Sequence, residues 1–83
     1  MGSNLYYVYI LLCEDQTLYT GVARDVEKRF MAHVLGVGAK YTKSHKPVKI
    51  VYKERKRNKS SALKREFAIK KLSKTEKLAL IER

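Results

Sequence analysis

An arginine and a histidine four residues apart are the first candidates for chemistry in this sequence. Arg29 and His33 share one face of a predicted helix, because residues four positions apart are neighbours on the helix surface. They border an apolar stripe formed by Val26, Phe30 and Val34, where both side chains can face a phosphate. The alternative is structural, with an arginine stem that covers apolar surface beside a half-buried histidine.

Two tyrosines form a second candidate group. Tyr9 lies in one β-prone segment, and Tyr19 lies in the next. If a three-residue loop, 14–16, joins these segments, Tyr9 pairs with Gly21 and Tyr19 pairs with Leu11, so both tyrosines lie on one face of the sheet. A loop with an even number of residues puts them on opposite faces. Tyrosines clustered in strands are also typical of cross-strand packing without any chemistry.

Glu66 is a third candidate, because it lies among the apolar positions of a predicted helix. Those neighbours are Ala62, Leu63, Phe67 and Ile69. A carboxylate buried there is costly unless it is paired or binds a metal. Lys70, four residues later, can supply the pairing. The other interpretation is a hard cation, since Mg²⁺ often takes only one or two protein carboxylates and completes its shell with water and phosphate.

The distribution of basic residues is the fourth signal. Nineteen Lys and Arg residues against eight Asp and Glu residues give a net charge of +11, and all the basic residues follow position 23. Such a surface is typical of proteins that bind a polyanion, and we expect nucleic acid, either DNA or RNA. The predicted contacts are Arg24, Lys40, Tyr41 and Lys43, of which the last three lie in a basic loop at 37–46.

Length and composition limit the class of protein. Eighty-three residues are enough for one domain, 1–83, with one core. Cys13 is the only cysteine, and no Cys/His spacing typical of a metal site is present, so we expect a reducing compartment, the cytoplasm. The longest apolar run, 5–13, is too short to cross a membrane and lacks the flanks of a signal peptide, so no membrane partner is expected.

The elements that position these residues can be predicted from apolar periodicity and turn-forming residues. The first half of the chain predicts two strands, a helix and a loop, at 5–12, 18–23, 26–35 and 37–46, after a flexible start at 1–4. Asp25 offers a side-chain oxygen to cap the helix, and Gly36 follows its last turn. The first strand is apolar on both faces, so we expect it to be covered on both sides.

The second half of the chain predicts a third strand and two more helices. Pro47 opens a strand in which apolar positions 48, 50 and 52 alternate with positions 49, 51 and 53. Ser60 can cap a helix at 61–72, and Ser73 with Glu76 forms a capping box for a last helix, in which residues 78 and 81 face the core. We therefore predict an α/β protein of the α+β type. It has a three-stranded antiparallel sheet flanked by helices, in the order β-β-α-β-α-α.

These pieces, in this order and spacing, resemble the GIY-YIG nuclease family and in particular its small, stand-alone, single-domain members. Two tyrosine-containing triplets resemble the paired signature that gives the family its name. An arginine and a histidine follow in the next helix, and an acidic residue follows in a later long helix. The small members also carry a stretch like Gly38 to Thr42. The matching residues are Tyr7-Val8-Tyr9, Tyr19-Thr20-Gly21, Arg29, His33 and Glu66.

The resemblance implies a metal-dependent endonuclease that hydrolyses DNA phosphodiester bonds with a single Mg²⁺ or Mn²⁺ ion. Glu66 would hold the metal, and Tyr9 or Tyr19 would help to activate the attacking water. Arg29 would stabilise the charge that develops on phosphorus. His33 would orient a tyrosine or contact the phosphate. A protein partner that supplies targeting is a further expectation, because no second domain is present to select a substrate.

The sequence departs from the family pattern at a few positions. Val8 and Thr20 stand where the signature has isoleucine, Tyr7 stands where it has its first glycine, and residues 77–81 lack an asparagine found in many family nucleases. Two alternatives follow. The first is a catalytically weak or silent nucleic-acid-binding module that keeps the fold. The second is a basic ribosomal or RNA-chaperone-like protein, which leaves Glu66 and the tyrosine pair unexplained.

Overall fold

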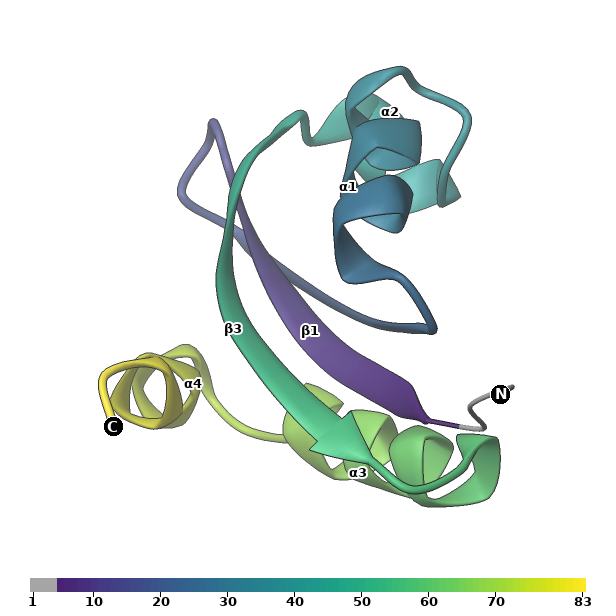
Figure 1. Cartoon of the computed structure of the whole chain (residues 1–83). Helices are drawn as coiled ribbons and strands as arrows, with labels where there is room; N and C mark the ends of the chain where they lie inside the picture. Colours follow the sequence, from purple (N-terminus) through teal and green to yellow (C-terminus); the bar gives the residue numbers. More distant parts are fainter. Residues whose placement is uncertain (1–4) are drawn as a thin grey trace.

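A computed structural model of the protein describes residues 5–83, so the flexible start predicted at 1–4 lies outside the described residues. The described part forms one antiparallel sheet and helices on both of its faces (Figure 1). The elements are β1 (Tyr6–Cys13), β2 (Leu18–Ala23), α1 (Val26–Val34), α2 (Lys40–Ser44), β3 (Pro47–Lys56), α3 (Lys59–Lys70) and α4 (Lys74–Ile81). None of the helices in residues 5–83 is long and apolar enough to cross a membrane.

The central strand divides the core into two layers. The strand order is β2-β1-β3, so β1 is paired on both sides, and its successive side chains point to opposite faces. Val8 and Ile10 pack with Ala62 and Ile69 of α3, while Tyr9 and its neighbours pack against α1. Figure 1 shows α1 and α2 on one side of the sheet and α3 and α4 on the other. The predicted sheet flanked by helices is confirmed.

The turn between β1 and β2 has three residues, 14–16. The amide of Cys13 donates to the carbonyl of Thr17 over 2.9 Å, and the amide of Gln16 donates back to the carbonyl of Cys13 over 2.9 Å. Gln16 has a positive φ of 69°, which is the left-handed residue that closes three-residue hairpin loops. Tyr9 therefore pairs with Gly21, as an odd loop requires, and the two candidate tyrosines lie on one face.

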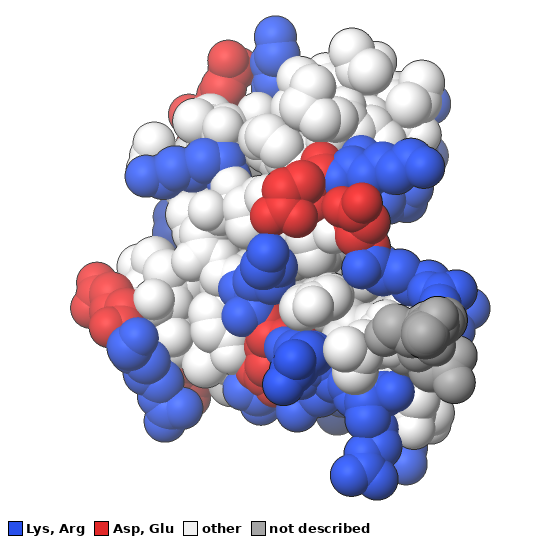
Figure 2. Space-filling model, in the orientation of Figure 1, with Lys and Arg blue, Asp and Glu red and all other residues white. Residues whose placement is uncertain are grey.

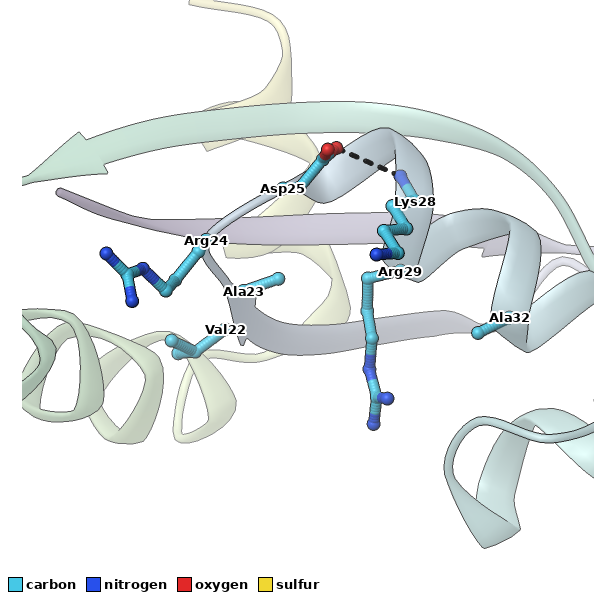
Figure 3. Close-up of a pocket in the computed structure, with 7 residues that line it drawn as sticks. All are labelled: Val22, Ala23, Arg24, Asp25, Lys28, Arg29 and Ala32. Carbon is cyan, nitrogen blue, oxygen red and sulfur yellow. Dashed lines mark hydrogen bonds between the residues drawn. The ribbon is translucent and has the colours of Figure 1, made fainter. Parts of the chain in front are cut away.

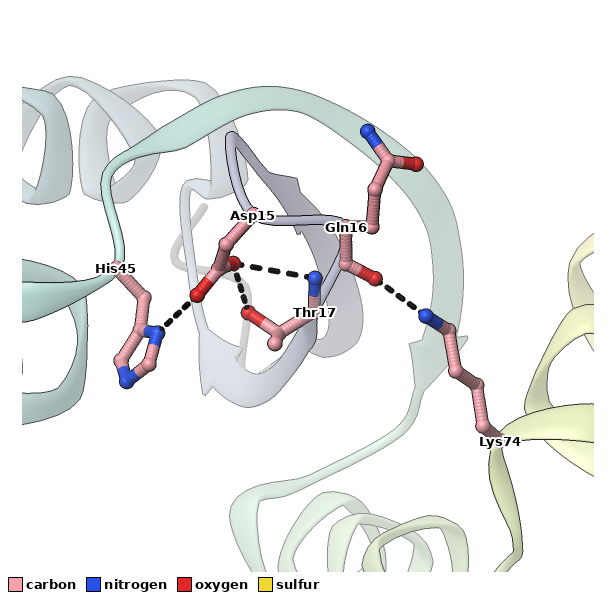
Figure 4. A network of polar contacts seen from close by, with 5 residues as sticks. All are labelled: Asp15, Gln16, Thr17, His45 and Lys74. Atoms are coloured by element: carbon pink, nitrogen blue, oxygen red, sulfur yellow. Dashed lines mark hydrogen bonds and ion pairs between the residues drawn. The ribbon is translucent and has the colours of Figure 1, made fainter.

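This turn also contacts both helical layers (Figure 4). Asp15 accepts hydrogen bonds from Thr17, and its other carboxylate oxygen lies 2.5 Å from Nδ1 of His45, which follows α2. The ammonium of Lys74 in α4 donates to the carbonyl of Gln16 over 2.6 Å. Hydrogen bonds from Thr17 and His45 lower the pKa of Asp15 to about 2. The hairpin end is thus joined to elements on opposite faces of the sheet.

The alternation predicted for the third strand is wrong, because β3 contains a bulge. Ile10 pairs with Tyr52, but the next residue, Leu11, pairs with Ile50, which leaves Val51 as the extra residue. Ile50 therefore packs in the α1 layer, whereas Tyr52 packs in the α3 layer. A regular strand would have put both side chains on one face. The strand also continues beyond the alternating positions, to Lys56.

Two helix predictions also need correction. The loop predicted at 37–46 contains the short helix α2, whose Thr42 is buried. α3 begins two residues earlier than predicted, because the side chain of Asn58, and not that of Ser60, accepts a hydrogen bond from the amide of Ser61 over 2.8 Å. Asn58 has the extended backbone that a capping residue requires. The capping box of Ser73 and Glu76 at the start of α4 is confirmed.

The buried sides of α3 and α4 are narrower than the sequence predicts. Ala62 and Ile69 of α3 are fully buried, while Phe67 is 63% exposed. At about 100° per residue, Phe67 lies roughly 140° around the helix from Ala62, beyond the reach of the sheet. Its ring instead packs beneath the ammonium of Lys71, 4.3 Å from the ring centroid. Other positions predicted to face the core are also exposed, namely Leu63 in α3 and Leu78 in α4.

Candidate active site

A buried chain of hydrogen bonds runs from β1 through α1 to α2. The hydroxyl of Tyr9 lies 2.9 Å from Nε2 of His33, and both side chains are only 1% exposed. On the other side of the imidazole, Nδ1 lies 2.8 Å from Oγ1 of Thr42. The Thr42 hydroxyl donates to the carbonyl of Ala39 over 2.9 Å. Groups separated by 33 positions in the sequence thus form one continuous polar path.

Two glycines make room for this chain. Gly21 is paired directly with Tyr9, and a Cβ atom there would lie 2.5 Å from the Tyr9 hydroxyl. A Cβ atom at Gly38 would lie 2.3 Å from Nδ1 of His33. Real Cβ atoms do not approach other heavy atoms so closely, so any larger residue at either position must displace the tyrosine or the imidazole.

Further aromatic rings continue from the buried pair toward the surface. The ring of Tyr19 lies 6.4 Å from that of Tyr9 and packs edge-on against His33, with 5.1 Å between ring centroids. Tyr19 also stacks with Tyr41 of α2 at 5.7 Å, and Tyr41 stacks in turn with His45 at 4.0 Å. Tyr41 is 37% exposed. Its ring is thus partly accessible, although it is held between the rings of Tyr19 and His45.

Burial controls the protonation of the Tyr9–His33 pair. Loss of solvation, with a smaller contribution from the Tyr19 hydroxyl, raises the pKa of Tyr9 to about 12, and Arg29 opposes this by hydrogen bonding and by its charge. Burial, followed by the positive charge of Arg29, lowers the pKa of His33. At neutral pH both side chains are therefore uncharged, and one proton is shared across the 2.9 Å contact between them.

Arg29 connects this pair to a basic groove. The groove has a volume of about 490 Å³ and lies between the end of β2 and the first turns of α1 (Figure 3). Its cationic lining consists of Arg24, Lys28 and Arg29, and Figure 3 shows the guanidinium groups of Arg24 and Arg29 extending in different directions. Asp25 caps α1 by accepting from the amide of Lys28 over 3.0 Å. The groove suits an anionic ligand beside Tyr9.

The charge of Glu66 acts on Tyr9 from the opposite helical layer. β2 is an edge strand, and both α1 and α3 pack against it, so side chains from the two layers can meet along this edge. The negative charge of Glu66 contributes to the raised pKa of Tyr9, while Arg29 lowers it. Glu66 is half-buried, with a side chain that is 20% exposed. The predicted pairing is present as well, with 3.2 Å between Oε2 of Glu66 and Nζ of Lys70.

A divalent cation fits this carboxylate. Residues 5–83 contain no group of three or more His, Cys, Asp and Glu side chains that could hold a metal ion together. Mg²⁺ and similar hard cations do not require one, because a single carboxylate with water and phosphate oxygens can complete their shell. The ammonium of Lys70 competes for the same carboxylate, but its side chain is 51% exposed and can move into solvent.

The other predicted residues lie around this centre. Lys40 and Lys43 are exposed on α2, and Arg24 lines the groove, with its guanidinium 5.5 Å from the ring centroid of Tyr6. His33 is buried and bonded to Tyr9, which favours tyrosine orientation over phosphate contact. In Figure 2, Lys and Arg side chains gather over the lower part of the molecule, where Figure 1 places α3.

Two contributors to the site were missed by reasoning from the sequence. The sequence predicts a loop at the position of Thr42, and it predicts no role for Lys28. The signal for Thr42 was its place in the stretch 38–42, which also contains the glycine that packs against His33. Lys28 directly precedes Arg29 in α1 and could have been found from its position one turn after the cap.

Comparisons with known proteins show the family of this chain. The sequence matches the family model of the GIY-YIG catalytic domain over residues 5–79. A UPF0213 protein of Staphylococcus saprophyticus is 54% identical over 76 residues, which cover 92% of this chain and 93% of that protein. A UPF0213 protein of Clostridium perfringens is 55% identical over 75 residues, which cover 90% of this chain and 81% of that protein.

A solved structure has the same fold. The solution NMR structure of a UPF0213 protein from Bacillus halodurans matches with a TM-score of 0.60 and 38% sequence identity. The match covers 94% of this chain and 83% of that chain.

Proposed function

Because this chain belongs to the GIY-YIG catalytic domain family, we propose that it is a divalent-metal-dependent endonuclease that hydrolyses DNA phosphodiester bonds. The observation that carries the proposal is the buried hydrogen bond between Tyr9 and His33, together with the basic groove that Arg29 lines. The charges of Arg29 in α1 and Glu66 in α3 also act on the pKa of Tyr9, in opposite directions.

Each side chain has a distinct task in this reaction. The groove residues Arg24 and Lys28 bind the phosphate backbone and position it. Arg29 stabilises the negative charge that grows on the phosphoryl oxygens in the transition state. Tyr9 receives the proton of the attacking water and is held in place by His33. Exposed Lys40 and Lys43 on α2 extend the positive surface beyond the groove.

Glu66 is the residue that would hold Mg²⁺ or Mn²⁺, and the bound cation would supply a Lewis acid for the phosphate oxygens. The role of Lys70 then depends on the state of the site. Without a cation its ammonium neutralises the half-buried carboxylate, and with one it would turn toward solvent. We further propose that a partner protein supplies targeting and that the protein acts in the reducing cytoplasm, which the free thiol of Cys13 favours.

A second candidate function is nucleic-acid binding without cleavage. The Glu66–Lys70 ion pair favours it, because a carboxylate already neutralised by a lysine needs no cation. The positive surface and the groove would serve both functions equally well.

One assay separates the two. Purified protein is incubated with branched, single-stranded and duplex DNA, with Mg²⁺ or Mn²⁺ and with a chelator. The nuclease requires cleavage that the chelator abolishes. Glu66→Gln should keep the fold and DNA binding but lower cleavage by orders of magnitude, whereas Glu82→Gln, an exposed carboxylate at the end of α4, serves as the matched control and should cleave like the wild type. Full cleavage by Glu66→Gln would refute the metal assignment, and binding without any cleavage would favour the second function.

A further inference from the structure

The hydroxyl of Thr42 is in a position to decide which nitrogen of His33 carries the proton. Thr42 is 2% exposed, and its side chain has a single hydrogen to donate. That hydrogen is directed to the carbonyl of Ala39, 2.9 Å away. Toward His33 the Thr42 oxygen therefore acts as an acceptor, so Nδ1, at 2.8 Å, is the nitrogen that donates. A neutral imidazole carries one N–H, which leaves the lone pair on Nε2.

One contact favours the opposite tautomer. The amide of Ala39 points to Nδ1 over 3.3 Å, which would require a lone pair on that nitrogen. This contact is half an ångström longer than the contact to Thr42, and it lies beyond the usual range of a good N–H donor. The shorter contact decides the tautomer, and Gly38 permits it, because any side chain there would push the imidazole away from Thr42.

We propose that Thr42 is a positioning residue that holds His33 in the Nδ1–H tautomer, so that Nε2 can accept the proton of the Tyr9 hydroxyl. The catalytic meaning of this tautomer rests on the proposed nuclease function. A water molecule forms its bond to phosphorus and gives a proton to the Tyr9 oxygen, while the original Tyr9 proton moves to Nε2. The phosphorus–oxygen bond to the leaving sugar breaks, and the sugar oxygen takes a proton from solvent. His33 later returns its extra proton to solvent.

This relay avoids an ionised tyrosine. With a pKa of about 12, Tyr9 does not lose its proton at neutral pH, but it can pass one on as it receives another. The buried imidazole is neutral and ready to accept. In the opposite tautomer Nε2 would donate to Tyr9 and could accept nothing, so the tyrosine would orient a water molecule without taking its proton. The hydroxyl of Thr42 thus decides whether Tyr9 and His33 can relay a proton or whether Tyr9 can only orient a water molecule.

The tautomer can be measured without any nuclease activity. Long-range ¹H–¹⁵N correlation spectra of labelled protein at pH 7.5 distinguish protonated from unprotonated ring nitrogens. We expect Nδ1 of His33 to be protonated in the wild type and in Thr42→Ser, which keeps the hydroxyl. Thr42→Val keeps the shape but cannot accept a hydrogen bond, and its proton should move to Nε2, because only the Ala39 amide then contacts Nδ1. His45, whose Nδ1 is bonded to Asp15, is the internal control in the same spectra.

Cleavage provides the second readout. Thr42→Val should lower kcat by roughly tenfold to a hundredfold, the usual effect of removing a partner that orients a histidine, with KM unchanged, and Thr42→Ser should restore it. A wild-type protein with the proton on Nε2 overturns the proposal even if Thr42→Val fails to fold. A Thr42→Val variant that keeps the Nδ1 proton overturns it too. If the tautomers are as expected but no DNA is cleaved, the assignment to Thr42 stands and the nuclease proposal fails.

Discussion

Tyr9 and Tyr19 share a face of the sheet but not a role. Tyr9 is almost fully buried, and its hydroxyl is fixed by His33, whereas Tyr19 is half-buried and meets His33 through ring contacts. Only Tyr9 has a hydrogen-bonded route by which a proton can leave. Between the two tyrosines that the family resemblance leaves open, the structure thus favours Tyr9 as the proton acceptor.

This difference predicts unequal effects of removing each hydroxyl. Tyr9→Phe should lower kcat by roughly 10²–10⁴, the range for loss of a general acid–base group. It should also lower the free energy of unfolding by about 1–3 kcal/mol, because Nε2 of His33 loses its partner. Tyr19→Phe is the matched control and should lower kcat by less than about tenfold. Equal losses in single-turnover assays of the two variants would contradict the choice of Tyr9.

Stability should fall as His33 becomes protonated. The pKa of His33 is below about 6.5 in the folded protein and near that value in the unfolded chain, so the unfolded state binds more protons in between. The free energy of unfolding is therefore greatest above pH 6.5 and decreases as the pH falls toward the folded value. Urea midpoints at pH 7.5 and pH 5.5 measure this. Asp15 and Glu54, whose pKa values are lowered to about 2, lose their contributions only at lower pH.

The matched variants identify the histidine responsible. His45→Gln should keep the loss of stability between pH 7.5 and pH 5.5, because the buried imidazole of His33 is still present. His33→Gln should reduce it. The reverse pattern would exclude His33 as the source of the loss.

How much of the site could be predicted differs from residue to residue. Tyr9 and Tyr19 follow from strand periodicity once the turn has three residues, and Glu66 follows from helical angle, about 40° from the buried Ala62. The contact between His33 and Thr42 could not be predicted in this way. It depends on how a short helix returns to α1, and residues nine positions apart have no fixed relation outside a regular element.

At the scale of elements, the local sequence predicts whether a segment forms a strand or a helix. The residue at which the element begins depends on which of several nearby residues caps it. Asn58 and Ser60 can both cap a helix, and the chain uses the earlier one. The bulge at Val51 is another such case, because no turn residue marks it in the sequence. Its cause is tertiary: Ile50 and Tyr52 both gain burial when they face different helical layers.

The position of the α3 cap gives a direct test of the element boundary. Asn58→Ala should lower the free energy of unfolding by about 1 kcal/mol, since a capping side chain is lost. Ser60→Ala, an exposed position inside the first turn, should change it by less than about 0.5 kcal/mol. Chemical denaturation of both variants at pH 7 measures the difference. A larger loss for Ser60→Ala would place the start of α3 where the sequence alone predicted it.

At the scale of the whole molecule, the positive charge should make nucleic-acid binding strongly dependent on salt. Each phosphate neutralised contributes about −0.9 to the slope of log K against log salt on duplex DNA, and about −0.7 on a single strand. Lys40→Gln and Lys43→Gln should each make the slope shallower by about that amount. Each should weaken binding to all nucleic-acid sequences alike. Lys77→Gln, on α4 at the opposite face of the sheet, is the control. Fluorescence anisotropy between 50 and 200 mM salt measures the slopes, and an unchanged slope for both α2 variants would exclude α2 from the interface.

The pairing of Leu11 with Tyr19 beside the turn at 14–16 limits where this gene can gain codons. Side chains alternate along a strand, so an extra codon that shifted the pairing by one residue would move Tyr19 to the face covered by α3. An extra codon absorbed as a fourth turn residue would leave Tyr19 beside Tyr9. Homologues with longer turns, and peptide tags grafted here, should therefore keep this pairing and carry every added residue in the loop itself.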